Sequence, residues 1–80
     1  MKKNKDQLSA KEKQVLQLSA KGMTRTEISK ALNISHHTVD YHIRNSLKKL
    51  NATNITSAVV MAISGGLLKL PESIEWFSSM

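Results

Sequence analysis

The sequence predicts an all-α fold, a small domain of four helices with a short C-terminal extension. Ser9-Ala-Lys-Glu12 and Thr24-Arg-Thr-Glu27 are capping boxes, in which a hydroxyl and a glutamate satisfy the backbone N–H groups left free where a helix begins. Apolar residues then recur at helical rather than strand spacing. The 80 residues are enough for one domain, and the absence of cysteine excludes disulfides and thiolate metal sites.

The first two helices have clear predicted ends. The first begins after Ser9 and stops near Gly22, which readily adopts the left-handed backbone conformation that ends many helices. Thr24 caps a short second helix, which Asn33 can end in the same conformation. The second helix is expected to turn three apolar residues inward: Ile28, Ala31 and Leu32.

A turn of only three residues, Asn33 to Ser35, separates the second helix from the third. This is the spacing of a helix-turn-helix, two helices at a steep angle joined by a tight turn, so the fold class becomes a tetrahelical helix-turn-helix domain. Ser35 caps the third helix, and Ile34 is expected to insert into the core.

The third helix is strongly two-sided. Its apolar residues Val39, Ile43, Leu47 and Leu50 lie within about 80° of one another on a helical wheel. The opposite side carries a carboxylate, a guanidinium, a phenol and other polar groups, so it suits a polar, anionic ligand. These residues are His37, Asp40, Tyr41, Arg44 and Lys48.

Asn54 is the predicted cap of a fourth helix, Ile55–Ser64, which Gly65 and Gly66 end. Its apolar residues do not keep to one stripe, so it should be buried on more than one face, which in a chain this small requires a partner chain. Residues 1–7 are expected to form a mobile basic lead. Residues 69–80 form a tail that can make a short helix.

Charge is unevenly distributed along the chain. The net charge is +6, but residues 1–50 carry +7 and residues 51–80 carry −1. This asymmetry suggests two different partners, although better solubility would explain it as well. No apolar run approaches the roughly 18 residues needed to span a bilayer, and no secretory signal follows the basic start. We therefore expect a cytoplasmic protein with no membrane partner.

Spaced motifs resemble the LuxR/GerE-type helix-turn-helix domain. They include Leu8-Ser-x-Lys-Glu-Lys-x-Val15-Leu16 and Leu32-x-Ile34-Ser35-x-x-Thr38-Val39-x-x-His42. The likeness continues through Lys49-Leu50-Asn51-Ala52-x-Asn54 and covers about residues 8–68. The Asn-Ala-Thr-Asn loop looks most like the quorum-sensing branch of the family.

This resemblance implies a third helix that enters the DNA major groove and a fourth helix that pairs two subunits. The residues expected to read bases are Asp40, Tyr41 and Arg44. Those expected to contact phosphate are Thr24, Thr26, Ser35, His37, Thr38, Lys48 and Lys49. The expected dimer interface comprises Ile55, Val59, Ala62 and Ile63.

Two positions depart from the family pattern. The family usually has a large apolar residue where this chain has Ser46, and a basic or amide residue is common where it has Asp40. Arg44 could contact guanine O6 and N7 while Asp40 accepts from cytosine N4. Alternatively Asp40 and Arg44, at positions i and i+4, simply pair with each other.

The three histidines do not predict a metal site. His37 and His42 lie about 140° apart on the helical wheel, and no acidic cluster completes a tetrahedral ligand set. His42 borders the apolar stripe and is expected to be partly buried and hydrogen-bonded.

The sequence therefore favours a dimeric, sequence-specific, double-stranded DNA-binding transcription regulator with no cofactor, which could also contact RNA polymerase. No arrangement suggests an activated nucleophile, so an enzyme is not expected. The alternative is a stand-alone interaction module that pairs through the fourth helix with a full-length LuxR-type regulator and antagonises it. Such a module need not keep its third helix basic.

Overall fold

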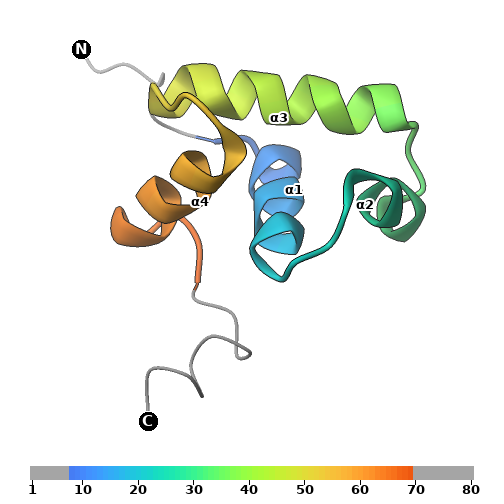
Figure 1. Cartoon of the computed structure of the whole chain (residues 1–80), viewed down its shortest axis with the longest axis horizontal. Coiled ribbons are helices and arrows are strands. Elements are labelled where there is room, and N and C mark those ends of the chain that lie inside the picture. Colours follow the sequence, from blue (N-terminus) through green and yellow to red (C-terminus); the bar gives the residue numbers. More distant parts are fainter. Residues whose placement is uncertain (1–7, 70–80) are drawn as a thin grey trace, which may run out of the picture.

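Four α-helices and no strand make up the part of the chain that the structure, a computed structural model, describes: residues 8–69 (Figure 1). The helices are α1 (Ala10–Ala20), α2 (Arg25–Leu32), α3 (His36–Leu50) and α4 (Ile55–Ser64). The predicted all-α helix-turn-helix fold with four helices is confirmed. The predicted basic lead and the tail beyond residue 69 lie outside the described residues.

The helices begin at the capping residues that the sequence predicts. Both capping boxes are present: the Ser9 hydroxyl accepts from the Glu12 N–H at 3.1 Å, and the Glu12 carboxylate accepts from the Ser9 N–H at 2.9 Å. Thr24 and Glu27 repeat this exchange at the start of α2. Ser35 and Asn54 cap α3 and α4. Local hydrogen bonding thus fixes where each helix starts.

The turn between α2 and α3 depends on Asn33. Its backbone is left-handed, with φ of +56°, a conformation that asparagine tolerates better than most residues. Asn51 ends α3 in the same conformation, which the sequence analysis had treated only as part of a loop. Because Asn33 reverses the chain within three residues, α3 starts beside α2.

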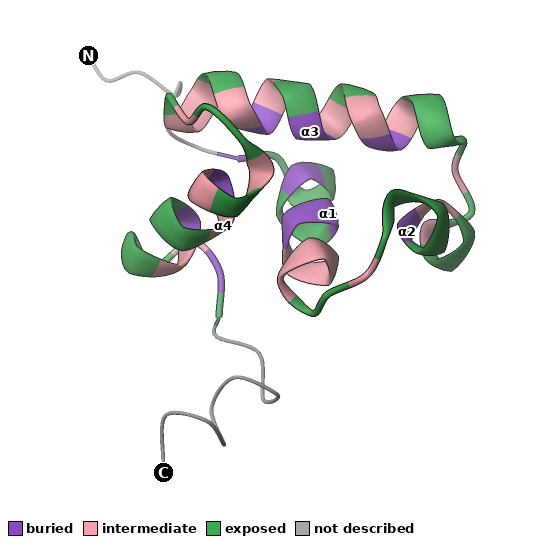
Figure 2. Ribbon diagram, in the orientation of Figure 1, coloured by how far each residue is buried: buried purple, intermediate pink, exposed green. Residues whose placement is uncertain are grey.

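Three helices pack beneath the longest one. Figure 1 shows α3 lying across α4, α1 and α2, with α1 in the middle. One core cluster joins α1 to α2 and α3, and its fully buried members include Val15, Ile28 and Val39. The other joins α1 to α4 and includes Leu16 and Ala58. In Figure 2 the buried residues accordingly lie on the sides of the helices that face one another.

One predicted core residue is outside the core. Ala31 is exposed, whereas Ile28 is fully buried and Leu32 and Ile34 are half-buried. The reason is that α2 packs only against α1 and α3, so the stripe from Ile28 to Leu32 is enough to cover its inner side. The prediction that Ala31 points inward was wrong, and that for Ile34 is confirmed in part.

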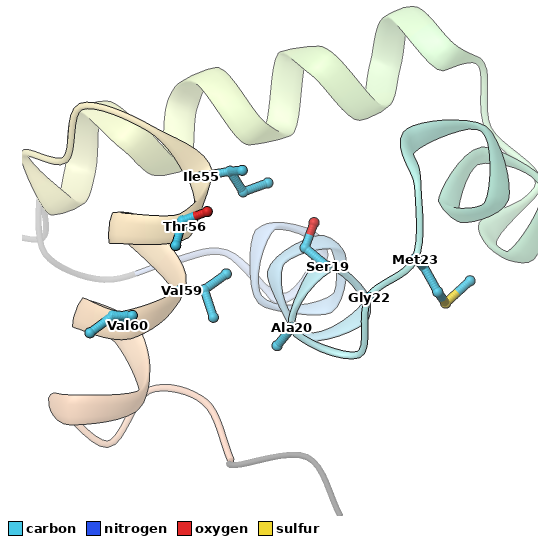
Figure 3. Close-up of a pocket in the computed structure, with 8 residues that line it drawn as sticks. All are labelled: Ser19, Ala20, Gly22, Met23, Ile55, Thr56, Val59 and Val60. Carbon is cyan, nitrogen blue, oxygen red and sulfur yellow. The ribbon is translucent and has the colours of Figure 1, made fainter. Parts of the chain in front are cut away.

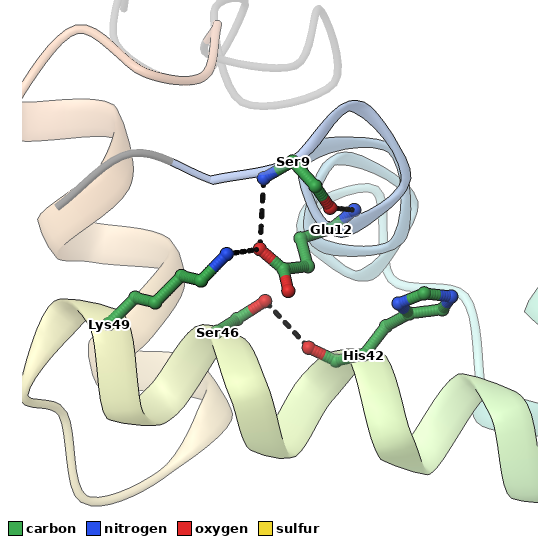
Figure 4. Close-up of polar contacts among 5 residues, drawn as sticks. All are labelled: Ser9, Glu12, His42, Ser46 and Lys49. Carbon is green, nitrogen blue, oxygen red and sulfur yellow. Dashed lines mark hydrogen bonds and ion pairs between the residues drawn. The ribbon is translucent and has the colours of Figure 1, made fainter. Parts of the chain in front are cut away.

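Two polar residues lie inside the domain, Glu12 on α1 and Ser46 on α3. The Glu12 side chain accepts from Lys49 Nζ at 2.8 Å as well as from the Ser9 N–H (Figure 4). Ser46 is fully buried, and its hydroxyl donates to the His42 carbonyl at 2.8 Å. Both buried groups are therefore hydrogen-bonded, as buried polar groups must be if they are not to destabilise the fold.

The environment of Glu12 makes it more acidic than a free glutamate. Burial by itself would raise the pKa of Glu12, but the hydrogen bond and charge of Lys49, together with hydrogen bonds from Ser9, outweigh burial and lower that pKa. A carboxylate with a lower pKa in the folded state stabilises that state at pH values above its unfolded pKa of about 4.3. This stabilisation is lost as the pH falls through the lowered, folded pKa.

We predict that Glu12→Gln lowers the free energy of unfolding at pH 7 by about 1–3 kcal/mol, because Lys49 loses its charged partner. The difference from the unmodified protein should shrink as the pH falls below about 4 and through the lowered pKa of Glu12, because the protonated Glu12 side chain is then neutral, as glutamine is at every pH. Urea unfolding followed by circular dichroism measures this. Glu27→Gln is the matched control, since Glu27 holds the same capping position but is exposed. Equal losses for both variants would assign the effect to capping.

Candidate nucleic-acid interface

One side of α3 is free of other helices along its length. Its exposed residues follow helical spacing and fall within about 60° on a helical wheel. Val39, Ile43 and Ser46 are buried on the opposite side. We call the exposed set the α3 stripe; it consists of His37, Tyr41, Arg44 and Lys48.

The α3 stripe offers several kinds of contact. Tyr41 is 56% exposed and packs edge-on against the His42 ring, with ring centroids 5.5 Å apart. Arg44 is exposed in the middle of the stripe, and His37 and Lys48 lie towards its two ends. From residue 37 to residue 48 the stripe is about 17 Å long. It thus combines a central guanidinium and phenol with cationic or polar groups on either side.

The predicted phosphate contacts divide between the two ends of α3. At its start, Thr26 Oγ1 lies 3.3 Å from His36 Nε2, and Ser35 Oγ lies 2.9 Å from Thr38 Oγ1. The first contact joins the starts of α2 and α3, and the second lies within the start of α3, so several hydroxyl groups are exposed in this region. The two lysines lie at the other end, in the last turn of α3.

Those two lysines differ, although they are neighbours in sequence. Lys48 is exposed, whereas Lys49 turns inward and places its ammonium 2.8 Å from the buried carboxylate of Glu12. An ammonium in this contact is occupied, so Lys49 is not available as a phosphate contact in the way the sequence suggested. We therefore remove Lys49 from the candidate interface and retain Lys48.

Asp40 forms an ion pair that the sequence analysis missed. Its Oδ1 lies 2.8 Å from Nε of Arg25, the first residue of α2, and not on Arg44 as one of the two interpretations proposed. The Nε–H group of Arg25 does not form a hydrogen bond with Oδ1 of Asp40, so the contact between the two side chains is electrostatic. Asp40 lies at the edge of the α3 stripe, towards α2. No local pattern reveals the partner, since 15 positions separate Asp40 from Arg25 and only the helix crossing brings them together.

A second surface lies on α4. Ala58 and Ala62 are fully buried against the core, so Ala62 has no side-chain surface for a partner, contrary to its predicted place in a dimer interface. Ile55 is half-buried and packs against both core clusters. Val60, which was not among the predicted interface residues, is 57% exposed. The outer arc of the helix, which we call the α4 face, consists of Thr56, Val59, Val60 and Ile63.

The α4 face borders a shallow apolar groove of about 400 Å³ (Figure 3). The groove runs between α4 and the end of α1, and Figure 3 shows Val59 beside Ala20 on its two walls, with Met23 farther along. Met61, 43% exposed, lies about 100° around the helix from Val60 and is not among the residues that line the groove. The exposed apolar surface of α4 therefore spans more than one side, with Val60 beside the groove and Met61 away from it.

Within residues 8–69, no three histidine or acidic side chains stand close enough together to hold a metal ion. His42 is half-buried as expected, but its Nδ1 is buried without a hydrogen-bond partner among these residues, which corrects the prediction of a hydrogen-bonded ring. No helix in this range combines the length and apolar character needed to cross a membrane.

Comparison with known proteins gives consistent matches. The family model described as "Bacterial regulatory proteins, luxR family" matches residues 6–62. The solved structure of the transcription factor GerE has a TM-score of 0.77 and 31% identity, and the match covers 80% of this chain and 96% of that one.

Several curated relatives match over the same region. Transcriptional activator protein SolR of Ralstonia nicotianae is 48% identical over 61 residues, covering 76% of this chain and 26% of that protein. Regulatory protein SdiA of Escherichia coli is 42% identical over 60 residues, covering 75% and 25%. The HTH-type quorum sensing-dependent transcriptional regulator RpaR of Rhodopseudomonas palustris is 39% identical over 66 residues, covering 82% and 27%. The chain spans about a quarter of the length of these relatives.

The different surroundings of the two lysines lead to a prediction about stability. Lys49→Ala should lower the free energy of unfolding by about 1–2 kcal/mol, because the buried Glu12 carboxylate loses a charged partner. Lys48→Ala should change it by less than about 0.5 kcal/mol, as is usual for an exposed side chain. Thermal and urea unfolding of the two variants provide the comparison. A loss of the same size in both would show that Lys49 does not stabilise the fold through Glu12.

Proposed function

The chain belongs to the luxR family of bacterial regulatory proteins, and from this membership we propose that it binds double-stranded DNA sequence-specifically, as a dimer, to regulate transcription. The family is one of regulatory proteins, which agrees with the expectation that the chain is not an enzyme. The observation that carries the proposal is the α3 stripe, an exposed polar helix side with a guanidinium at its centre.

The proposed binding mode places α3 in the major groove. That groove, about 12 Å wide in B-DNA, admits an α-helix and presents a distinct pattern of donors and acceptors for each base pair. Arg44 can donate two hydrogen bonds to guanine O6 and N7, and Tyr41 can pack against a thymine methyl group. Both are exposed at the middle of the stripe, where base edges would be nearest.

Groups at the two ends of α3 would contact the phosphates on either side of the groove. Backbone N–H groups at the starts of α2 and α3 suit phosphate oxygens. Lys48 and the +7 charge of residues 1–50 supply the sequence-independent attraction that arises when bound cations are released from DNA. The proposed phosphate contacts are Thr24, Thr26, Ser35, His37, Thr38 and Lys48.

The α4 face is the proposed dimer interface. It exposes Val60 and parts of Val59 and Ile63, apolar surface that a second copy would cover. Pairing through this face would present two α3 helices to half-sites about one helical turn apart. RNA polymerase is a further expected partner. The cytoplasm is the expected location, since DNA is the proposed ligand.

The other candidate is the interaction module that pairs with a full-length LuxR-type regulator and antagonises it. This function needs the α4 face but not an exposed Arg44 or Lys48 on α3. Arg44 and Lys48 are both exposed, and neither takes part in the ion pairs found within residues 8–69. DNA binding is therefore the better supported function.

The test is to incubate the protein with a pool of randomised duplexes and to sequence the bound fraction at two salt concentrations. We expect enrichment of a site with two-fold symmetry and weaker binding at the higher salt concentration. Salt-sensitive binding without enrichment would contradict sequence-specific recognition. Absence of binding would direct the search to a protein partner of the α4 face.

For Arg44 we predict that Arg44→Ala loses about 1–3 kcal/mol of binding free energy on the enriched site and relaxes the preference at one base pair. Lys48→Ala is the control: it should weaken binding to all sequences alike and reduce the slope of log affinity against log salt by about 1. Fluorescence anisotropy with enriched and scrambled duplexes measures both. If Arg44→Ala weakened binding to the two duplexes equally, Arg44 would contact phosphate and not a base.

For the dimer, we predict that Val60→Glu yields monomers in sedimentation experiments, because it places a carboxylate on the α4 face. Met61→Glu is the matched control, an exposed apolar residue one position later that lies on another side of α4. Both substitutions are at exposed positions and should leave the fold intact. A Val60→Glu protein that stays dimeric would refute the proposed interface.

A further inference from the structure

We infer that Arg25 is a further specificity-determining residue of the DNA-contacting surface, and that Asp40 acts as its positioning residue and does not read a base itself. This inference rests on the DNA-binding function proposed above. It follows from the ion pair between α2 and α3 and from the hollow that surrounds it.

The Asp40 carboxylate is already directed towards Arg25 in the free protein. Its Oδ1 lies 2.8 Å from Arg25 Nε and has almost no surface exposed to solvent. That oxygen is therefore shielded from an incoming cytosine amino group. Base reading through this oxygen would require the ion pair to open first.

The same contact leaves most of the Arg25 guanidinium free. An arginine side chain has five N–H donors, and the contact of Arg25 with Asp40 is made at Nε. The structure gives the four N–H groups on the two Nη atoms no acceptor among residues 8–69, and half of the side chain is exposed. These four donors form the end of the planar fork that binds guanine O6 and N7 or a phosphate.

A hollow of about 270 Å³ connects this pair to the base-reading part of α3. Its lining includes Arg25, Asp40 and Arg44, so two arginines and one aspartate border the same hollow at the edge of the α3 stripe. Asp40 reduces the repulsion between the two arginines, which would otherwise favour conformations with the guanidinium groups far apart. Together, Arg25, Asp40 and Arg44 carry one net positive charge, which suits an electronegative partner.

The ion pair is better suited to positioning than to stabilising the fold. Its side chains are 50% and 38% exposed, and solvent screens pairs of this kind strongly. Holding Arg25 in one orientation before binding instead reduces the entropy that would be lost on contact with DNA. Loss of Asp40 should therefore be felt in recognition far more than in stability.

The experiment compares Arg25→Ala, Asp40→Asn and the double variant with the unmodified protein. For each, the affinities for the enriched and a scrambled duplex are measured at one salt concentration, and their ratio is the readout. A general change of charge alters both affinities and leaves the ratio unchanged. We expect Arg25→Ala to lower the ratio about tenfold, the usual effect of losing a charged hydrogen bond.

Asp40→Asn should lower the ratio about three- to tenfold when Arg25 is present, and by less than about twofold in the Arg25→Ala background. A reduction of the same size in both backgrounds would show that Asp40 reads a base on its own and would overturn the inference. No reduction in either background would overturn it too, as would an equal loss on the two duplexes for Arg25→Ala.

Two further variants keep the test clear of folding effects. Arg25→Lys retains the charge and the helix start but lacks the planar fork, so its ratio should fall as for alanine. Lys30→Ala removes an exposed cation from the last turn of α2 and should leave the ratio unchanged. Thermal unfolding of every variant checks that the fold is kept.

The ion pair can also be followed without DNA. Asp40→Asn should shift the Arg25 Nε–H resonance in the NMR spectrum of the free protein, and an unchanged resonance would refute the pairing. Failure of the proposed function has a different signature, since the unmodified protein would then enrich no sequence. Enrichment by the unmodified protein, combined with an Arg25-independent effect of Asp40→Asn, would refute this inference alone.

Discussion

Two neighbouring residues of α1, Val15 and Leu16, are fully buried in different core clusters, and the arrangement of the other helices depends on them. Consecutive residues of a helix point about 100° apart, so the two side chains anchor different neighbours. Val15 packs with α2 and α3, and Leu16 packs with α4. Because α1 touches all three other helices, a domain of this size can hold together with two small clusters.

On this framework, two ion pairs hold α3 to its neighbours, and they differ in their physical role. The Glu12–Lys49 pair is largely buried and connects the last turn of α3 to the start of α1, where loss of one charge leaves the other in a poorly solvated place. The Arg25–Asp40 pair is exposed and connects α3 to the start of α2. The first therefore contributes to stability, whereas the second mainly determines where a guanidinium lies.

The α4 helix shows how residue size divides a largely apolar sequence into two surfaces. Alanines 58 and 62 face the core, where their small side chains let α4 approach α1 and α3 closely. The larger Val60 faces outward beside the groove at the end of α1. Hydrophobicity alone predicts burial for all of these residues, but the space available between helices decides which of them the domain itself buries.

The sequence by itself determined the features that depend on residues within one helical turn of each other. The capping boxes at Ser9 and Thr24, the left-handed Asn33 and the two-sided character of α3 were all predicted correctly. These features could be predicted because hydrogen bonds and side-chain directions within a turn are set by local geometry. They were enough to give the four helices, their approximate ends and the outward side of α3.

Only the tertiary structure decided which of the chemically similar residues on these helices are free. It directed Lys49 inward and left Lys48 exposed, paired Asp40 with Arg25, and buried Ala62 while exposing Val60. Each of these outcomes depends on the angles at which helices cross, and therefore on contacts between residues far apart in the chain. A helical wheel gives directions around one helix, but it does not give the position of the neighbouring helices.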